Sequence, residues 1–597
     1  MKELQALLPY LRRYAGTIAA GIVLVIVANA FSLAGPWFIK QGIDALGRPD
    51  VTRALVLRYA LLVLAVALLG GAARYGMREL LNSTSRRVEF DLRNDFFRHL
   101  MRLDAGFYGA APTGDLMSRA TNDIQAVRMV AGPAYMYLVN TIFSTIFSLA
   151  LMVLIDVRLT VYALIPMLLL PPVTLVFGNA IHQRFERIQA QLADVSTLVQ
   201  ENLSGVRIVK AYGQEQAQID RFERASADYL ERNLSLVRVS GLFHPLLAVL
   251  SGIGMAVVLW AGGRAVIGGQ ISIGDFVAFG LYLGMLTWPM ISLGWVVNLF
   301  QRGAASMGRI NRILEATPRI AEPRQPAVLA EVRGELEMKG VGFRYPGTER
   351  WILRDVSFHL PAGQTLAIVG PTGSGKSTLV ALLARLYDPS EGEVLLDGVP
   401  LPDLSLEQLR AAIGVVPQDA FLFSDTIGAN LALGFDESDE AAREARVRAA
   451  AQVAQLDETV TAFPAGYATR LGERGINLSG GQKQRATLAR AIARDPRVLI
   501  LDDALSAVDT HTEHAILQGL RTVRAERTTV IVSHRVSAVM DADLIIVLED
   551  GEIVERGTHA ALMAHGGVYA ALQRRQLLAE DLEDVAQLAP IPGEGID

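Results

Sequence analysis

Six long apolar runs occupy the first 305 residues of the chain, and each is near the length that crosses a bilayer. Their approximate limits are Gly16–Ile39, Val56–Tyr75, Pro133–Ile155, Leu159–Ile181, Gly241–Gly263 and Phe276–Phe300. A bilayer core takes roughly 20 apolar residues per helix, whereas the apolar part of a cleaved signal peptide takes roughly 7–15. Because a helix satisfies its own backbone hydrogen bonds in lipid, the pattern predicts an all-α transmembrane domain of six helices over residues 1–305.

The polar stretches between these runs alternate between short and long. Residues 76–132 and 182–240 are long, polar and expected to be helical, and both lie on the same side of the membrane. The first stretch and the N-terminal flank are basic, with Lys2, Arg12, Arg13, Arg78, Arg86, Arg87, Arg93, Arg98 and Arg102. The positive-inside rule therefore predicts that this side is cytoplasmic.

Few charged residues interrupt the apolar runs. Lys40, Arg58, Arg74, Arg264 and Asp275 all lie near their ends. An ionisable group at the centre of a membrane segment would suggest a path for ions or protons. Since none of these is central, we expect a cargo that is apolar or amphipathic.

The character of the chain changes after a proline-containing polar junction, residues 306–334. Short β-type runs then alternate with helical stretches over residues 335–575, and an acidic tail, 576–597, ends the chain. The expected strands are Thr365–Gly370, Glu393–Leu396, Ile413–Val416, Val498–Leu501, Thr529–Val532 and Leu544–Leu548. Such alternation is typical of an α/β domain, so the fold class is a six-helix transmembrane domain followed by an α/β P-loop domain.

A phosphate-binding loop follows the first of these strands. Gly370-Pro-Thr-Gly-Ser-Gly-Lys-Ser377 matches G-x-x-x-x-G-K-[ST] between a strand and a helical pattern. Its glycines let backbone N–H groups surround phosphate oxygens, Lys376 adds a positive charge, and the Ser377 hydroxyl can ligate Mg²⁺. The apolar strand Val498–Leu501 ends in Asp502, a carboxylate suited to the same ion. ATP and Mg²⁺ are the expected ligands.

Bulk composition excludes other classes of function. The 597 residues contain no cysteine, which excludes disulfides, thiol catalysis and Cys-based zinc sites. The formal net charge of −5 gives no basic face for nucleic acid.

Leu478-Ser-Gly-Gly-Gln482 resembles the signature of the ATP-binding-cassette family, and it precedes Asp502 at the spacing that the family shows. The resemblance implies that Leu478, Ser479, Gly480, Gly481 and Gln482 contact ATP bound to a partner subunit. A helix start with small residues suits such an anion contact.

Further family elements follow in order, and their roles are those that the resemblance implies. Tyr345 resembles the aromatic residue that stacks on adenine, Gln418 resembles the glutamine at the metal site, and His534 resembles the histidine that holds the γ-phosphate. Ser506 and Asp509 resemble the loop that crosses the dimer interface. The resemblance assigns catalysis to Asp503, His534 and Gln418, metal binding to Ser377, Gln418 and Asp502, and ATP binding to Tyr345, Gly370, Thr372, Gly373, Ser374, Gly375, Lys376, Ser377 and Thr378.

The membrane half resembles the exporter branch of this family, because six helices and the ATPase share one chain. Phe107-Tyr108 with residues 113–119, and residues 201–210, resemble cytoplasmic coupling segments. The resemblance implies efflux of hydrophobic or amphipathic compounds such as drugs, lipids or peptides. It places the protein in the inner (plasma) membrane of a prokaryote, in contact with lipid, with both termini and the ATPase domain cytoplasmic. An ATP-gated channel or regulator stays open, while the six spans and the absence of a basic face argue against a soluble role in DNA repair or on ribosomes.

One position departs from the family pattern. Members usually have glutamate directly after the magnesium-binding aspartate, and here Asp503 stands in its place. Aspartate keeps the charge but is one methylene shorter, and base catalysis depends on hydrogen-bond reach. We therefore expect this chain's own ATP site to hydrolyse poorly. The pattern resembles the weak-site subunit of heterodimeric multidrug exporters, so a second half-transporter is the favoured partner. A homodimeric lipid flippase or drug exporter with two slow sites is the alternative.

Overall fold

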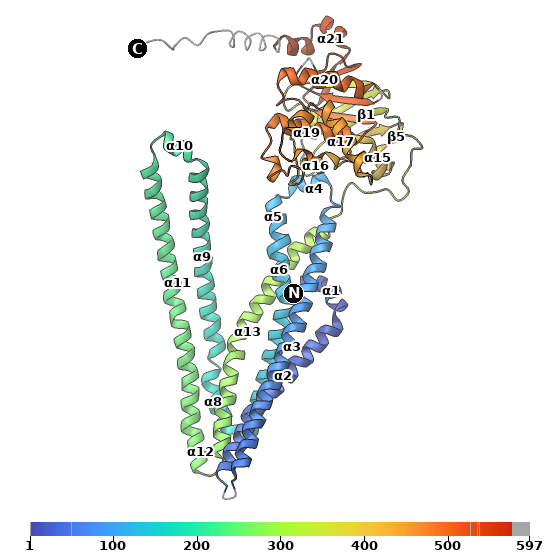
Figure 1. Ribbon diagram of the computed structural model, residues 1–597. Helices are drawn as coiled ribbons and strands as arrows, with labels where there is room; N and C mark the ends of the chain where they lie inside the picture. Colours follow the sequence, from blue (N-terminus) through green and yellow to red (C-terminus); the bar gives the residue numbers. More distant parts are fainter. Residues whose placement is uncertain (1, 49–50, 526, 534, 536–537, 576–597) are drawn as a thin grey trace. The chain divides into compact units, whose positions relative to one another are not determined.

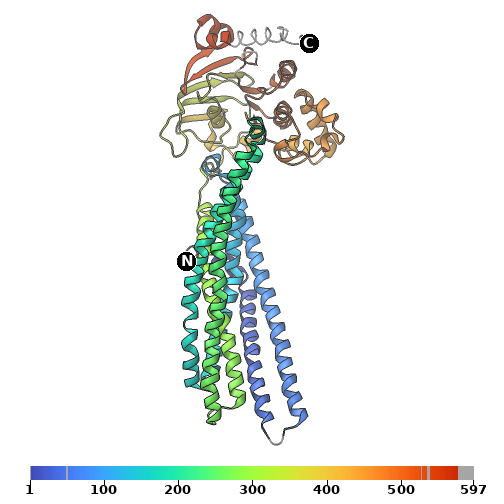
Figure 2. The same cartoon turned by 90° about the vertical axis from the view of Figure 1, so that its left-hand side faces the viewer.

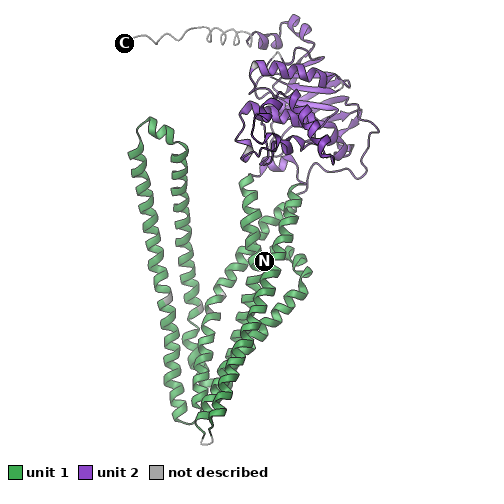
Figure 3. Ribbon diagram, viewed as in Figure 1, with its two compact units in different colours: residues 1–101, 113–316 green, residues 102–112, 317–597 purple. Residues whose placement is uncertain are grey.

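The computed structural model describes residues 2–48, 51–525, 527–533, 535 and 538–575. They form two compact units (Figure 3). Unit 1 comprises residues 1–101 and 113–316, and unit 2 comprises residues 102–112 and 317–597. The short segment 102–112 thus belongs to the unit that contains the α/β domain, although it comes from the first long polar stretch.

Unit 1 is helical throughout its described part. Six of its helical stretches are long and apolar enough to cross a membrane: Ala15–Leu46, Arg53–Leu100, Thr113–Ile155, Val157–Ser204, Glu215–Ile267 and Ile273–Leu314. The predicted six-helix architecture is confirmed. The elements are η1 (Lys2–Leu7), α1 (Leu8–Arg13), α2 (Ala15–Leu46), α3 (Arg53–Leu100), α5 (Thr113–Ser118), η2 (Arg119–Asp123), α6 (Ile124–Met129), η3 (Val130–Ala134), α7 (Tyr135–Ile155), α8 (Val157–Met167), α9 (Leu170–Ser204), α10 (Val206–Ala211), α11 (Glu215–Val257), η4 (Val258–Gly262), α12 (Gly263–Ile267) and α13 (Ile273–Leu314).

The helices extend well beyond the apolar runs that reveal them. Helix α3 is 48 residues long and ends at Leu100, although its apolar run ends near Tyr75. Helices α9 and α11 continue through the second polar stretch and are joined by the short α10, so that they form a long hairpin (Figures 1 and 2). Hydropathy marks only the part of a helix that lies in lipid, and the polar continuation keeps the same backbone hydrogen bonding.

The fourth apolar run is divided between two helices. Helix α8 ends at Met167 and α9 begins at Leu170, with Pro171 and Pro172 in its first turn. Proline lacks an N–H group, and the first turn of a helix is where that group has no intrahelical partner. The two prolines therefore set the start of α9 within a run that hydropathy alone presents as continuous.

The charges near the ends of α2 and α13 join these two helices. The Lys40 Nζ atom lies 2.6 Å from the Asp275 Oδ1 atom. Nearby, the Asp44 carboxylate accepts hydrogen bonds from the Gly274 N–H at 3.0 Å and the Ser272 hydroxyl at 2.9 Å. Ser272 and Asp275 also form a capping box at the start of α13. The Lys40 and Asp275 side chains thus pair with each other, and hydrogen bonds hold the Asp44 carboxylate against the start of α13.

Unit 2 contains two sheets. The six-stranded sheet has the order β10-β9-β3-β8-β7-β6, parallel except for β10, and the four-stranded sheet is antiparallel with the order β2-β1-β4-β5. The strands are β1 (Leu336–Phe343), β2 (Leu353–Leu360), β3 (Thr365–Val369), β4 (Glu391–Leu396), β5 (Val399–Pro400), β6 (Ile413–Val416), β7 (Val498–Asp502), β8 (Thr528–Val532), β9 (Leu544–Glu549) and β10 (Glu552–Gly557). The predicted α/β class is confirmed.

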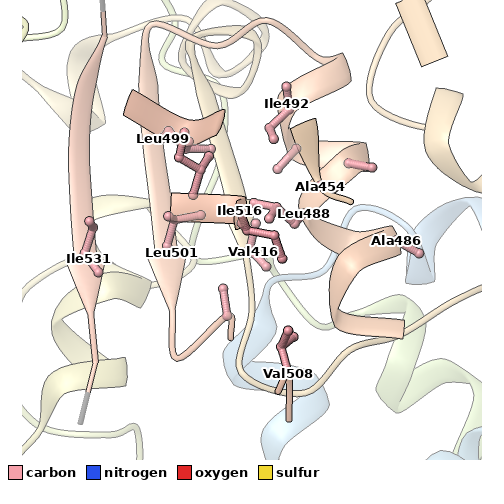
Figure 4. Close-up of a cluster of buried hydrophobic side chains, with 14 of the residues drawn as sticks. Val416, Ala454, Ala486, Leu488, Ile492, Leu499, Leu501, Val508, Ile516 and Ile531 are labelled. Carbon is pink, nitrogen blue, oxygen red and sulfur yellow. The ribbon is translucent and has the colours of Figure 1, made fainter. Parts of the chain in front are cut away.

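Unit 2 also contains helices and short helical turns. They are α4 (Ala105–Ala110), α14 (Lys376–Leu383), α15 (Leu406–Ala412), α16 (Ile427–Ala432), α17 (Glu440–Val453), α18 (Asp457–Thr461), α19 (Gly480–Ala493), α20 (Thr510–Arg524) and α21 (His559–His565), with the short turns η5 (Leu401–Asp403), η6 (Gly466–Ala468) and η7 (Glu473–Gly475). Leu499 and Leu501 of β7 face Leu488 and Ile516 in one buried cluster (Figure 4).

Leu499→Ala should lower the unfolding temperature of the full-length protein. The Leu499 side chain is fully buried, and a buried leucine truncated to alanine typically costs about 2–5 kcal/mol. Thermal unfolding in detergent, followed by light scattering and fluorescence, measures the change. Leu433→Ala is the control, because Leu433 is 57% exposed and its truncation leaves no cavity. Equal behaviour of the two variants would contradict the described core.

Candidate nucleotide-binding site

The phosphate-binding loop connects β3 to α14, as its sequence predicts. All five residues of β3 are buried, which fixes the loop's starting point in the sheet. Gly370 has a φ of 151° and Gly375 a φ of 101°, conformations that residues with a Cβ rarely adopt. A Cβ on Gly370 would also collide with the Leu548 carbonyl oxygen, and one on Gly375 would lie 2.8 Å from the Leu353 side chain. Both glycines are therefore required by conformation and by space.

Lys376 is the first residue of α14 and reaches back over the loop. Its Nζ atom donates hydrogen bonds to the carbonyl oxygens of Gly370 at 2.9 Å and Pro371 at 2.8 Å. Burial lowers the pKa of Lys376, while the carboxylates of Asp502 and Asp503 act in the opposite direction. The ammonium thus lies where it can meet phosphate oxygens at the loop.

Ten of the thirteen residues predicted for this chain's own ATP and metal site line one pocket of about 300 Å³. From the phosphate-binding loop and α14 it takes Thr372, Gly373, Gly375, Lys376, Ser377 and Thr378, and from elsewhere Tyr345, Gln418, Asp502 and Asp503, with Ile352 and Val532. Gly370 and Ser374 belong to the loop but do not line the pocket. The pocket thus unites residues that are more than 150 positions apart in the sequence.

The oxygen ligands in this pocket fit a magnesium ion. The Ser377 hydroxyl, the Gln418 side-chain amide and the Asp502 carboxylate all line it, and Mg²⁺ takes hard oxygen ligands. Among the described residues no group of three His, Cys, Asp or Glu side chains could hold a metal by itself. This agrees with a site in which one carboxylate and the nucleotide's phosphates share the ion.

Tyr345 stands at the other side of the pocket, within a cluster of aromatic rings. Its ring packs edge-on against Phe343 and Tyr387, with centroids 5.1 Å and 5.4 Å away. Its hydroxyl shares a hydrogen bond of 3.0 Å with the Thr378 hydroxyl of α14. The ring is therefore held in place beside the loop, and it remains partly exposed.

Asp503 occupies an unusual backbone conformation. Its φ is +49°, and its N–H donates to the Val532 carbonyl oxygen at 2.9 Å. Aspartate is among the few residues other than glycine that tolerate the left-handed region, because its short polar side chain can hydrogen-bond locally. The neighbouring strands thus fix the backbone here, and the side chain's length decides how far the carboxylate reaches.

The signature residues lie apart from this pocket. Leu478 is buried, and Ser479 caps α19 in a capping box: the Gln482 N–H donates to the Ser479 hydroxyl, and the Ser479 N–H donates to the Gln482 side chain. None of Leu478–Gln482 lines the pocket described above. The first turn of α19 instead presents free backbone N–H groups at its end.

Gln484 is a residue that the sequence analysis missed. Its buried side chain donates to the Ser506 hydroxyl at 2.8 Å and accepts from the Ala507 N–H at 2.8 Å. The Ser506 hydroxyl in turn donates to the Asp503 carbonyl oxygen at 3.0 Å. Gln484 therefore joins the signature helix α19 to the loop that follows Asp503. Only its place two residues after the signature could have suggested it.

Gln484→Ala should loosen this loop and slow nucleotide hydrolysis. The change removes two hydrogen bonds and leaves the Ala507 N–H without its partner, at a cost of about 1–3 kcal/mol. Hydrogen exchange of residues 503–509 in the full-length protein should rise markedly, while exchange in β9 should not change. Gln482→Ala is the matched control, because Gln482 lies on the same helix and bonds only within the capping box. No change in exchange would show that the loop is held otherwise.

Three further predicted site residues lie at the ends of elements or in loops of unit 2. Asp509 caps α20, where its carboxylate accepts the Thr512 N–H at 2.9 Å, and this hydrogen bond lowers the pKa of Asp509. Ser506 is exposed and Gln418 follows β6. His534 lies outside the described residues.

Helix α4 packs within unit 2, beside the aromatic cluster of Tyr345. Asp104 caps α4 by accepting the Phe107 N–H, and its other oxygen accepts the Arg319 N–H at 2.7 Å. A Cβ on Gly106 would lie 3.5 Å from the Tyr387 ring. Of the two parts of the first predicted coupling segment, Phe107-Tyr108 belongs to unit 2 and residues 113–119 belong to unit 1.

Comparison with known proteins identifies both halves. A family model described as the ABC transporter transmembrane region matches residues 18–290, and one described as ABC transporter matches residues 353–506. The multidrug resistance-like ATP-binding protein MdlA of Escherichia coli is 37% identical over 577 residues, which cover 96% of each chain. The probable multidrug resistance ABC transporter ATP-binding/permease protein YheI of Bacillus subtilis is 38% identical over 95% of this chain and 96% of its own.

Two further similar proteins are a lipid flippase and an exporter of known structure. An ATP-dependent lipid A-core flippase of Aromatoleum aromaticum is 35% identical over 96% of each chain. Among solved structures, a bacterial Atm1-family ABC exporter with ATP bound superposes with a TM-score of 0.76 at 30% identity, covering 95% of this chain and 99% of that one.

Proposed function

Because the chain belongs to the ABC transporters, with the six-helix membrane region and the ATPase domain on one polypeptide, we propose that it exports hydrophobic or amphipathic compounds as the weak-site subunit of a heterodimer. It is an ABC transporter ATPase of the exporter and flippase type and a multi-pass inner-membrane protein. The names of the relatives refer to multidrug resistance and to lipid A-core, and drugs and lipids both belong to the proposed cargo class.

The observation that carries the proposal is the pocket between the phosphate-binding loop and Asp502 and Asp503. It combines a cationic side chain at the loop, Lys376, with the hard oxygen ligands Ser377 and Asp502. Bound Mg²⁺ would neutralise charge on the β- and γ-phosphates. Lys376 would hold these phosphates, and Tyr345 would stack on the adenine. Asp503 would orient the attacking water.

The proposed orientation places the ATPase domain and both termini in the cytoplasm. The first long polar stretch and the N-terminal flank are basic, and the second long stretch is expected on the same side of the membrane. The exposed residues Ser506 and Asp509, together with Ser479–Gln482, would meet the partner's ATPase domain. Closure of the two domains on ATP would shift the helices between inward- and outward-facing states.

Asp503 supports the heterodimer over the homodimer. The backbone of Asp503 is fixed and its side chain is one methylene shorter than glutamate, so its carboxylate would reach less far toward an attacking water and would orient that water poorly. An active site built from the partner's phosphate-binding loop and this chain's intact signature would then supply the turnover.

Isolation of the tagged chain from its native membrane tests the subunit composition. We expect a second chain of similar size, with glutamate after its own magnesium-binding aspartate, identified by mass spectrometry. Recovery of this chain alone as a dimer would contradict the heterodimer. ATP-driven accumulation of a fluorescent amphipath in inverted vesicles separates a pump from a channel, because a channel cannot move cargo against its gradient.

A further inference from the structure

Unit 1 contains a cavity whose only charged side chains are arginines. It measures about 310 Å³ and lies among α2, α3, α7 and α13, a size within the range of small-molecule sites. Arg74 and Arg78 are the charged residues of its lining, and the other lining side chains are uncharged. No acidic residue is among them.

The two arginines lack an anionic partner within the described part of the chain. The Arg74 guanidinium donates to the neutral Ser32 hydroxyl at 2.7 Å, and neither Arg74 nor Arg78 forms an ion pair with a described residue. They are spaced i,i+4 on α3, where like charges repel one another. The charged groups near the ends of α2 and α13, by contrast, are paired. Both side chains are exposed, so the cavity presents unpaired positive charge to an incoming anionic group.

The depth of the arginines matches a membrane interface. Arg74 follows the start of α3 by 21 residues, or roughly 32 Å at 1.5 Å per residue, which is about the thickness of the hydrocarbon core. A charged group at this level can hold a head group while apolar atoms extend into the cavity. Arginine is suited to phosphate or carboxylate because its planar fork binds two oxygens at once.

The remaining lining suits an apolar body. Met77, Met136 and Met285 are flexible and polarisable, so they adapt to tails of different shape. Trp288 and Tyr137 add flat apolar surfaces. Two polar side chains of the lining bond to each other, because the Asn29 amide donates to the Asn140 side-chain oxygen at 3.1 Å. Charge and apolar surface are thus arranged for one amphipathic molecule.

We propose that this cavity binds amphipaths with an anionic phosphate- or carboxylate-type head group at Arg74 and Arg78, and that it discriminates against cationic ones. The inference rests on the proposed export function and specifies its cargo. From hydropathy we expected an apolar or amphipathic cargo of unspecified charge, and the cavity now specifies an anionic head group.

Two probes with the same tail and opposite charge test the proposal. Binding of dodecyl phosphate and dodecyltrimethylammonium to the full-length protein in phosphatidylcholine nanodiscs is measured without ATP, with protein-free nanodiscs subtracted. The wild-type protein should bind the phosphate at least roughly 10-fold more tightly. The variant with both Arg74→Gln and Arg78→Gln should lose this preference, and the variant with both Arg74→Lys and Arg78→Lys should keep part of it. Arg58→Gln is the matched control, because Arg58 lies on the same helix outside the cavity.

The outcomes distinguish a membrane lipid from a free amphipath as the source of the head group. They also distinguish failure of the cavity proposal from failure of the proposed export function. Competition by phosphatidylglycerol in the nanodiscs would identify a lipid as occupant, and its failure to compete would identify a free amphipath. Equal wild-type binding of both probes, or an unchanged preference in the glutamine variant, would overturn the inference even if vesicle transport succeeds. A clear preference, combined with no ATP-driven transport in inverted vesicles of the native membrane that hold the complete transporter, would instead refute the export function and leave a binding cavity. The wild-type comparison needs no variant, so misfolding of a variant cannot hide the answer.

Discussion

Asp503→Glu should raise the ATP turnover of this chain's own site by about 100-fold, because general-base catalysis contributes roughly 10²–10⁴ in rate once the base reaches its water. The backbone at Asp503 is held by the hydrogen bond to Val532, so an added methylene extends the carboxylate into the pocket. Turnover is measured as phosphate release from the chain purified alone, where no partner site contributes. The positive φ disfavours glutamate, so a slightly lower unfolding temperature should accompany the gain.

Asp503→Asn provides the matched control. If the wild-type carboxylate contributes little, removal of its charge should leave the slow rate nearly unchanged, and nucleotide binding should persist in all three proteins. A wild-type rate of roughly 1–10 s⁻¹ for the chain alone would show that Asp503 is an adequate base. The proposed weak site would then be wrong, and the homodimer would be favoured.

Lys376→Met should weaken ATP binding by about 10–100-fold, because hydrogen bonds to a charged group contribute roughly 1.5–3 kcal/mol. Methionine has a similar volume, so it should disturb the packing of this buried position little. Titration with a fluorescent ATP analogue gives the dissociation constants of both proteins.

Lys339→Met is the control for loss of a lysine. Lys339 lies on β1, is half exposed and pairs with Glu337 on the surface, so its replacement should leave ATP binding unchanged. An unaltered dissociation constant in Lys376→Met would mean that the loop's backbone alone holds the nucleotide.

The sequence revealed the elements with a strong signal of their own. Each membrane helix contains a long apolar run, and each of the six predicted strands coincides with a strand of the structure, although the prediction Thr365–Gly370 extends one residue beyond β3. The phosphate-binding loop was predictable because its glycines, Lys376 and Ser377 form a local motif that can be recognised in the sequence between a strand and a helix. Its pocket partners Tyr345, Gln418 and Asp503 depended on resemblance, since nothing local links them.

The missed elements have weak patterns for physical reasons. Strand β1 loses its alternation where two exposed residues, Lys339 and Gly340, follow each other at a change of register. Strand β10 is an edge strand in which half of the residues are charged, with no buried position in it. Gln484 is a polar residue on a polar helix, and its partners become visible only when the chain folds. The arginine cavity likewise needs four helices, so hydropathy showed Arg74 merely as a charge near a helix end.

The position of Asp104 and α4 within unit 2 has a consequence for biosynthesis. The Arg319 N–H that Asp104 binds lies 215 residues further along the chain. At a translation rate of about 5–20 residues per second, a ribosome makes this stretch in roughly 10–40 s. Throughout that interval α4 exists without the domain against which it packs. The newly made membrane half therefore exposes α4 without its packing partners. Chaperones of the cell would be able to bind α4 before the ATPase domain has been synthesised.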